Sequence, residues 1–303
     1  MGTGDKSPGL SPRDARTRSV KPVWLARKID FKSMSETQSK LSGLRLHTVC
    51  VQARCPNISE CFGRGTATFL ILGDTCTRAC SFCNVTKGEP GAIDASEPQR
   101  ISQAVIKLAL KYIVITSVTR DDLEDGGASV FAKTIKILKN YDKALKVEVL
   151  VPDFKGYKPA IDAVLAAGPD VFGHNIETVP SLYNIRKGAD YSRSLGVLQY
   201  AAEKGALTKS SVMLGLGERE DEVMASFSDL RLAGCSYLSI GQYLQPDASH
   251  YPVKEYAMPE QFAYYKEEAL KMGFLHVESG PYVRSSYLAE NYNDPGPKTH
   301  NPG

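Results

Sequence analysis

Six of the seven cysteines in the 303-residue chain lie in two closely spaced triplets. The first triplet has the spacing CX4CX5C and the second has the spacing CX3CX2C. Iron–sulfur cubanes usually take four thiolate ligands. Each triplet therefore predicts a cluster with one iron left for another ligand, which distinguishes a reactive cluster from an electron carrier. The six ligands predicted in this way are Cys50, Cys55 and Cys61, and then Cys76, Cys80 and Cys83.

Zinc binding and plain core packing fit the two triplets less well than iron–sulfur clusters do. Structural zinc prefers four closed ligands in paired spacings, and only one of the five histidines, His47, lies near the triplets. Buried thiols can pack as small hydrophobes, but two ordered triplets within 34 residues disfavour that interpretation. Cys235 stands alone between a helical pattern and a strand pattern, and we interpret it as core packing.

The composition excludes several classes of protein. The formal charge is only +3 and no dense Lys/Arg run occurs, so no nucleic-acid partner is expected. No apolar run approaches the roughly 18 residues of a membrane helix, and residues 1–21 show no signal-peptide pattern. We therefore expect a cytoplasmic protein, in a reducing compartment where cysteines more often ligate metals than form disulfides.

Short apolar runs alternate with longer helical patterns from about residue 66 onward. The strands are predicted at Thr68–Leu72, Tyr112–Thr116, Val147–Val151, Val171–His174, Ser211–Leu214 and Tyr237–Gly241. The helices are predicted at Arg100–Leu110, Ser129–Lys139, Pro159–Ala166, Ser192–Glu203, Glu220–Leu232 and Glu260–Lys271. Six such units predict an α/β fold, a partial (β/α)6 TIM-like barrel. A doubly wound sheet is the alternative.

This barrel divides the chain into four segments. Residues 1–21 form a tail, and residues 22–65 form an N-terminal extension that carries the first cysteine triplet. Residues 66–273 form the barrel, and residues 274–303 form a C-terminal extension. We expect both extensions to cap the barrel.

The second triplet, with an aromatic residue (Phe82) before its last cysteine and a position after the first predicted strand, resembles radical S-adenosylmethionine enzymes. The first triplet, in the run Cys50-Val-Gln-Ala-Arg-Cys55-Pro-Asn-Ile-Ser-Glu-Cys61, resembles the lipoyl synthase family within that superfamily. Further similar stretches are Gly65–Phe69, Ile115–Leu123, Gly215-Leu-Gly-Glu218, Gly241-Gln-Tyr-Leu-Gln-Pro246 and Arg284-Ser-Ser-Tyr287. The resemblance runs from about Pro22 to about Ala289.

The resemblance implies two 4Fe–4S clusters of unequal role. The second triplet would hold the cluster that binds S-adenosylmethionine and yields a 5′-deoxyadenosyl radical. The cofactor then performs the difficult step, so no acid–base side chain is assigned as catalytic. The first triplet would hold an auxiliary cluster that donates sulfur to carbons 6 and 8 of a protein-bound octanoyl-lysine. The family's fourth ligand to this cluster is a serine, here Ser286, with Ser285 as the alternative.

Polar side chains near strand ends are the predicted contacts of S-adenosylmethionine. A carboxylate suits ribose hydroxyls, and an arginine suits the cofactor's carboxylate. Surface ion pairs or helix caps are the alternative roles of these residues. The residues are Thr116, Asn175, Glu177 and Arg193. His174 is interpreted as a satisfied core histidine, and Gly215-Leu-Gly217 either as a tight turn or as a backbone approach to adenine.

The resemblance also implies partners. The substrates would be octanoylated lipoyl carrier domains, from the E2 components of 2-oxo-acid dehydrogenases and from the glycine cleavage H protein. Reduced flavodoxin or ferredoxin would supply electrons. Three rival functions are a biotin-synthase-like or methylthio-transferring radical enzyme, a two-cluster electron carrier, and a zinc-dependent binding module.

Overall fold

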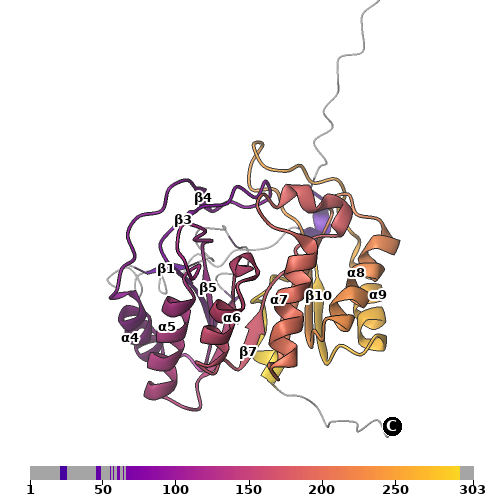
Figure 1. Ribbon diagram of the computed structural model, residues 1–303. Coiled ribbons are helices and arrows are strands. Elements are labelled where there is room, and N and C mark those ends of the chain that lie inside the picture. Colours follow the sequence, from indigo (N-terminus) through magenta and orange to yellow (C-terminus); the bar gives the residue numbers. More distant parts are fainter. Residues whose placement is uncertain are drawn as a thin grey trace, which may run out of the picture.

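The computed structural model describes residues 21–25, 46–48, 55, 57, 60–61, 64 and 66–293. Within these residues, one eight-stranded sheet has the strand order β1-β2-β5-β6-β7-β8-β9-β10. Every neighbouring pair is parallel except β1 (His47–Thr48) with β2, which is antiparallel. The helices lie in a row around the outside of the sheet (Figure 1).

All six predicted strands and all six predicted helices are confirmed as elements, with boundaries that shift by a few residues. The strands are β2 Thr66–Ile71, β5 Tyr112–Ser117, β6 Lys146–Leu150, β7 Val171–Gly173, β8 Thr208–Leu214 and β9 Tyr237–Gln242. The helices are α4 Glu97–Leu108, α5 Ala128–Tyr141, α6 Lys158–Leu165, α7 Tyr191–Glu203, α8 Glu220–Leu232 and α9 Pro259–Lys271. The predicted α/β class is therefore confirmed, with parallel strands joined by helices as in a partial barrel.

Two hydrophobic clusters form where the helices pack on the outer face of the sheet. One joins β2, β5 and β6 to α4, α5 and α6, and the other joins β8, β9 and β10 to α8 and α9. Because side chains alternate across a strand, the neighbouring positions face the opposite side. These positions include polar side chains that are fully buried, such as Glu148, Lys209 and Ser239. The inner face of the sheet is therefore partly polar.

The segment after α9 adds a strand that the sequence pattern does not predict. Strand β10 (His276–Gly280) pairs in parallel with β9 and extends the sheet to a seventh parallel strand. A short 3-10 helix, η4 (Ala289–Asn293), follows at the lower edge of the sheet (Figure 1). The predicted C-terminal extension thus contains one strand of the sheet itself.

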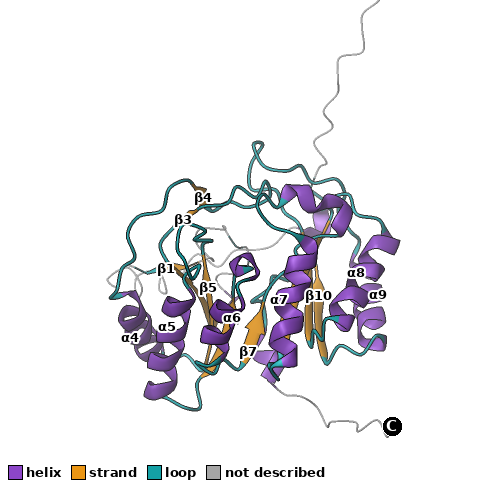
Figure 2. Ribbon diagram, viewed as in Figure 1, coloured by secondary structure: helices purple, strands orange, loops and turns teal. Residues whose placement is uncertain are grey.

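Loops that follow the strands gather at one edge of the molecule, with the two-stranded pair β3 (Thr75–Cys76) and β4 (Thr86–Lys87) among them (Figure 2). In parallel α/β folds, this carboxyl edge is where ligands bind. None of the helices in the described ranges is long and apolar enough to cross a membrane.

Candidate active site

The second cysteine triplet lies on the loop between β2 and α4. The chain turns sharply after β2 because Leu72 and Gly73 both have positive φ angles, of 69° and 92°. Backbone hydrogen bonds then fix the start of the loop: Thr77 N–H donates to the Thr119 carbonyl over 3.0 Å, and Gly88 N–H donates to the Cys76 carbonyl over 3.1 Å. The loop is therefore held against the end of the neighbouring strand β5.

The far side of the same loop contacts the other half of the sheet. Ser81 N–H donates to the Ile185 carbonyl over 2.9 Å, and the Ser81 carbonyl accepts from Tyr251 N–H over 2.8 Å. Phe82 packs on a small apolar cluster that contains Ile185 and Tyr243. The aromatic residue of the motif is thus an anchor for the cysteine loop.

The three thiols of this loop share one partly buried environment. The Cys76 sulfur accepts backbone N–H groups from Arg78 and Thr119, both at 3.4 Å. Burial raises the pKa of Cys80, and it raises the pKa of Cys83 to about 11; charge on Cys76 acts in the same direction on both thiols. Cluster binding, which requires thiolates, must therefore displace protons from Cys80 and Cys83.

Among the described residues, no group of three or more His, Cys, Asp or Glu side chains is close enough together to hold a metal ion. All the described cysteines are free thiols. The donor set nevertheless fits an iron–sulfur cluster, because three thiols share a single anchored loop and the charge of Cys76 raises the pKa of both Cys80 and Cys83.

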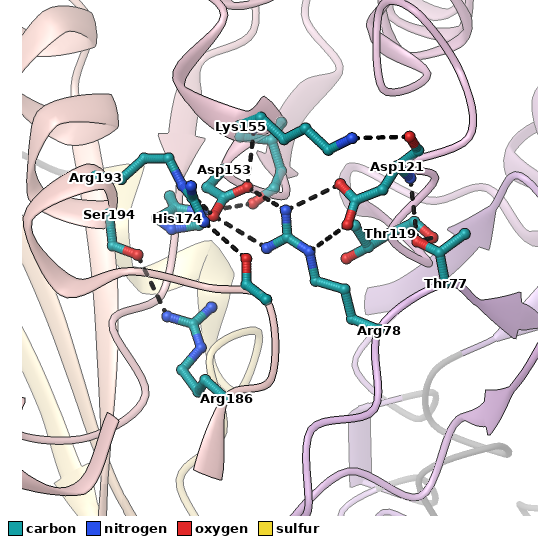
Figure 3. Close-up of polar contacts among 12 residues, drawn as sticks. Thr77, Arg78, Thr119, Asp121, Asp153, Lys155, His174, Arg186, Arg193 and Ser194 are labelled. Atoms are coloured by element: carbon teal, nitrogen blue, oxygen red, sulfur yellow. Dashed lines mark hydrogen bonds and ion pairs between the residues drawn. The ribbon is translucent and has the colours of Figure 1, made fainter. Parts of the chain in front are cut away.

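Arg78, inside the cysteine loop, is the centre of a buried ion-pair network (Figure 3). Its guanidinium makes two hydrogen bonds with Asp121, at 2.7 and 3.0 Å, and two with Asp153, at 3.0 and 2.7 Å. The Asp153 side chain is only 1% exposed. Burial would raise the pKa of Asp153, but the hydrogen bonds and charge of Arg78 hold it well below its usual value. The network fastens the loop to the ends of β5 and β6.

The predicted cofactor contact Arg193 belongs to this network. Its Nε donates to Asp153 over 2.8 Å and its Nη2 donates to the Gly188 carbonyl over 2.7 Å. The side chain is 29% exposed. Arg193 therefore lies beside the cysteine loop, with a carboxylate partner already in place.

Asn175 and Glu177, which follow β7, lie together at the same edge. Asn175 Nδ2 donates to Glu177 Oε1 over 3.1 Å. Glu177 has a φ of +66°, and burial raises the pKa of its carboxyl group although the Arg186 guanidinium opposes this. The charge of Glu177 also contributes to the raised pKa of Cys80. A carboxylate is thus held close to the cysteine loop.

The remaining predicted positions have local partners. Thr116 Oγ1 donates to the Leu150 carbonyl over 2.8 Å, on the adjacent strand. His174 is 1% exposed, its Nδ1 is 2.8 Å from the Val151 carbonyl, and burial lowers its pKa to about 4. His174 is therefore a core histidine, as the sequence predicts, but it is only half satisfied, because its Nε2 atom is buried with no hydrogen-bond partner among the described residues. The N–H groups of Gly215 and Leu216 both donate to the Glu218 carboxylate, at 2.6 and 2.9 Å.

Described parts of the N-terminal extension contact residues 282–287, which contain the Arg-Ser-Ser-Tyr stretch (residues 284–287). Asn57 Nδ2 donates to the Tyr282 carbonyl over 2.5 Å, and Tyr287 Oη donates to Glu60 over 3.0 Å. Burial lowers the pKa of Arg284, and the charge of Cys55 opposes this effect. Residues within the run of the first cysteine triplet therefore contact residues next to Ser286, the predicted fourth ligand of the auxiliary cluster.

The members of the first triplet are described unequally. Cys55 and Cys61 lie within the described residues, and Cys61 N–H donates to the Asn57 carbonyl over 3.0 Å. The predicted ligand Cys50 lies outside them. Of the two adjacent serines, Ser285 donates a hydrogen bond from its Oγ to Asn175 Oδ1 over 3.0 Å. This bond links the C-terminal segment that follows β10 to the loop after β7.

Gly241 explains how the C-terminal segment reaches this edge. A Cβ atom at this position of β9 would overlap the Val283 carbonyl oxygen. Only glycine therefore lets the chain after β10 cross so close to the strand. The resulting path carries residues 282–287 over the ends of β9 and β7.

Sequence reasoning missed Arg78, Asp121, Asp153 and Arg186 as parts of the site. Asp121 lies in a stretch that resembles the family, and Asp153 follows a predicted strand, so both carried a usable signal. Arg186 did not, because its contacts with the Asn175 and Ile176 carbonyls, at 3.0 and 3.2 Å, depend on the path of the 3-10 helix η3 (Pro180–Ile185).

Solved structures support the fold. A methylornithine synthase structure aligns with a TM-score of 0.51 at 11% identity and covers 81% of each chain. The structure of Streptococcus suis SuiB bound to precursor peptide SuiA aligns with a TM-score of 0.57 at 12% identity, covering 81% of this chain and 52% of that one. These likenesses, at low identity, concern the architecture alone.

Sequence comparisons show the family. The radical SAM superfamily profile matches residues 70–230. The lipoyl synthase of Geotalea daltonii is 55% identical over 274 residues, 90% of this chain and 93% of that protein. That of Geobacter sulfurreducens is 56% identical over 284 residues, 93% of each chain, and that of Caldicellulosiruptor saccharolyticus is 54% identical over 277 residues, 90% of this chain and 97% of that one. The chain therefore belongs to the lipoyl synthase family of the radical SAM superfamily.

Proposed function

We propose that this enzyme inserts two sulfur atoms at carbons 6 and 8 of a protein-bound octanoyl-lysine, as a lipoyl synthase. The observation that carries the proposal is the meeting of three segments at the carboxyl edge of the sheet. These are the CX3CX2C loop, the Asn175–Glu177 loop and the C-terminal segment, which Ser285 joins to Asn175. Family membership supports the same reaction.

Cys76, Cys80 and Cys83 are the proposed ligands of the first cluster. A 4Fe–4S cluster held by these residues, together with S-adenosylmethionine, would supply the one-electron chemistry needed to break an unactivated C–H bond. The chain's own contribution is to orient these groups and to exclude water. The loop anchored by Arg78, Ser81 and Phe82 is suited to this role because it is fixed from two sides of the sheet.

The nearby polar groups are the proposed contacts of S-adenosylmethionine. Glu177 suits the ribose hydroxyls, since its carboxylate lies beside the cysteine loop. Arg193 suits a carboxylate, although Asp153 already engages one edge of its guanidinium. Asn175 and Thr116 are the remaining proposed contacts, and their hydrogen bonds to Glu177 and to the Leu150 carbonyl orient them.

Cys50, Cys55 and Cys61 are the proposed ligands of the auxiliary cluster, with Ser286 as the fourth. The contacts of Asn57 with Tyr282 and of Glu60 with Tyr287 support this arrangement, because they bring the two segments together. Ser286 is favoured over Ser285 because the Ser285 hydroxyl is engaged by Asn175. A serine oxygen is a harder ligand than thiolate for a soft iron–sulfur site, so it is suited to leave.

The proposed substrates are octanoylated carrier domains of 2-oxo-acid dehydrogenases and of the glycine cleavage system. Reduced flavodoxin or ferredoxin is the proposed electron source, and the cytoplasm the proposed location. The modest positive charge of the chain agrees with an acidic protein partner.

Anaerobic reconstitution followed by incubation with S-adenosylmethionine, reductant and an octanoyl-lysyl peptide tests the proposal. The expected products are 5′-deoxyadenosine and thiolated peptide, and the absence of both would overturn it. Cys76→Ala should abolish 5′-deoxyadenosine formation. Cys55→Ala should retain S-adenosylmethionine cleavage and insert no sulfur. If both variants lost cleavage equally, the division of roles between the triplets would be wrong.

A further inference from the structure

The C-terminal segment, residues 281–293, runs from the carboxyl edge of the sheet to the opposite edge. It starts at the end of β10 and crosses Gly241 at the carboxyl ends of the strands. It then reaches the first residue of β2, where Thr66 Oγ1 donates to Glu290 over 3.1 Å. We name this segment the strap. It links the outermost parallel strands, β10 and β2, across the open side of the partial barrel.

Near its C-terminal end the strap carries a tyrosine, Tyr292, that is buried against the strands of the sheet. Tyr292 is 1% exposed, and its hydroxyl group is 2.9 Å from the Ser239 hydroxyl group on β9. Its ring contacts the rings of Tyr237 and His276, with centroid separations of 5.2 and 4.7 Å. A buried tyrosine is among the largest contributors to packing in a protein. The far end of the strap is therefore fixed to strands β9 and β10.

A buried ion pair lies directly against Tyr292. Lys209 Nζ is 3.0 Å from Glu148 Oε1 and lies 3.8 Å from the centre of the Tyr292 ring. The Lys209 and Glu148 side chains are each 1% exposed, and Tyr112 Oη donates to Glu148 over 2.6 Å. The attraction between a cation and a tyrosine ring is stronger when both are shielded from water. The ring and the ion pair therefore stabilise each other, and the proposed chemistry uses neither.

We propose that Tyr292 is a positioning residue, which anchors the strap and so holds Ser286 beside the auxiliary cysteines. The inference rests on the proposed function, in which Ser286 is a cluster ligand. Ser286 and Tyr292 are six positions apart, so even a fully extended chain spans only about 20 Å between them. With Gly280 fixed in β10 and Tyr292 fixed in the interior, Ser286 lies in the middle of a short tethered segment. Such tethering raises the effective concentration of a weak ligand.

The experiment uses full-length variants that carry Cys80→Ala, so that bound iron reports the auxiliary cluster. The variants are Tyr292→Ala, Tyr292→Phe and Ser286→Ala, and the matched control is Tyr141→Ala at the end of α5, where the tyrosine is 53% exposed. Two quantities are measured. One is hydrogen exchange over residues 281–289 in the cluster-free protein, and the other is the rate of iron loss to a chelator after anaerobic reconstitution.

Tyr292→Ala is expected to speed both exchange over residues 281–289 and iron loss by about ten-fold or more, because local opening then exposes the whole strap. Tyr292→Phe, which retains the ring and loses the hydrogen bonds of the hydroxyl group with Ser239 and with the Leu238 carbonyl, is expected to speed exchange roughly three-fold. The control should match the parent protein in both measurements. Ser286→Ala should lose iron faster and keep the parent's exchange rates.

Parent-like exchange in Tyr292→Ala would overturn the anchor. If that variant does not fold, parent-like exchange in Tyr292→Phe would overturn it instead. Fast exchange in Tyr292→Ala with parent-like iron retention would overturn the link between anchor and serine. Parent-like iron retention in Ser286→Ala would instead overturn the assignment of Ser286 as a cluster ligand in the proposed function. In that case, fast exchange in Tyr292→Ala would still support the role of Tyr292 as the anchor of the strap.

Discussion

Asp153→Asn should destabilise the fold through the ion-pair network that holds the cysteine loop. The substitution keeps the shape of the side chain and removes the negative charge between Arg78 and Arg193. Removing one partner of a buried ion pair costs about 3–5 kcal/mol. Because Arg78 keeps its bonds to Asp121, the lower end applies, about 3 kcal/mol.

Urea unfolding of the cluster-free protein under anaerobic conditions measures this cost. With a slope of about 3 kcal/mol per M, the midpoint should fall by about 1 M. The matched control is Asp221→Asn, because Asp221 also pairs with an arginine, Arg219, but is 71% exposed. Exposed ion pairs contribute little, so the control's midpoint should stay at the parent value. Equal shifts in the two variants would refute the importance of burial.

The pH dependence gives the same prediction a second test. The pKa of Asp153 lies below its usual value in the folded protein, so its stabilisation is complete above the unfolded pKa, about 3.9. That stabilisation is lost as the pH falls toward the folded pKa. The difference in free energy of unfolding between parent and Asp153→Asn should therefore be constant from about pH 5 to 8 and shrink below about pH 4. A difference that stays constant down to about pH 3 would refute the reasoning.

Three further predictions follow from the buried contacts. Gly241→Ala should displace the C-terminal segment, because the new Cβ overlaps the Val283 carbonyl. The amount of iron bound at the proposed auxiliary site after reconstitution should therefore fall more than for Gly196→Ala, whose Cβ meets open space. Cys235, with a pKa raised by burial to about 12, should resist iodoacetamide at pH 8 in folded protein and react only in urea, as mass spectrometry would record. Lys209→Met should lower the free energy of unfolding by about 3–5 kcal/mol, because it leaves Glu148 buried without a cation, and the double variant with Glu148→Gln should recover part of that loss.

The sequence predicts the sheet well wherever strands are apolar on the helix-facing side. Strand β10 is missed because His276–Gly280 has a single aliphatic side chain, Val277, and lies at the sheet edge with partly exposed neighbours. The start of β8 is also missed: the strand begins at Thr208, three residues before the predicted start at Ser211. A lysine such as Lys209 is expected to be exposed, and only the fold reveals that Glu148 faces it.

The sequence likewise predicts only part of the candidate site. Cysteine spacing is local, so the triplets can be recognised from the sequence alone. Arg78 pairs with residues 43 and 75 positions away, and such pairings follow from the topology of the sheet. Arg193 is predicted for its charge and its place after a strand; its actual partner, Asp153, is 40 positions away. The roles of Thr116, Asn175, Glu177, Arg193 and Ser286 in binding cofactors stay predictions.

The contacts between Asn57 and Tyr282 join residues 225 positions apart, and this spacing sets an order of assembly during synthesis. The ribosome delivers a chain from its N-terminus, and folding follows that order. The backbone partners of the CX3CX2C loop, from Thr119 to Tyr251, all precede residue 281 in the chain. Residues 282–287, which the described residues Asn57 and Glu60 contact, are synthesised later. A released chain that ends at residue 280 would therefore keep the backbone partners of the CX3CX2C loop and lose the contacts of Asn57 and Glu60 with residues 282–287.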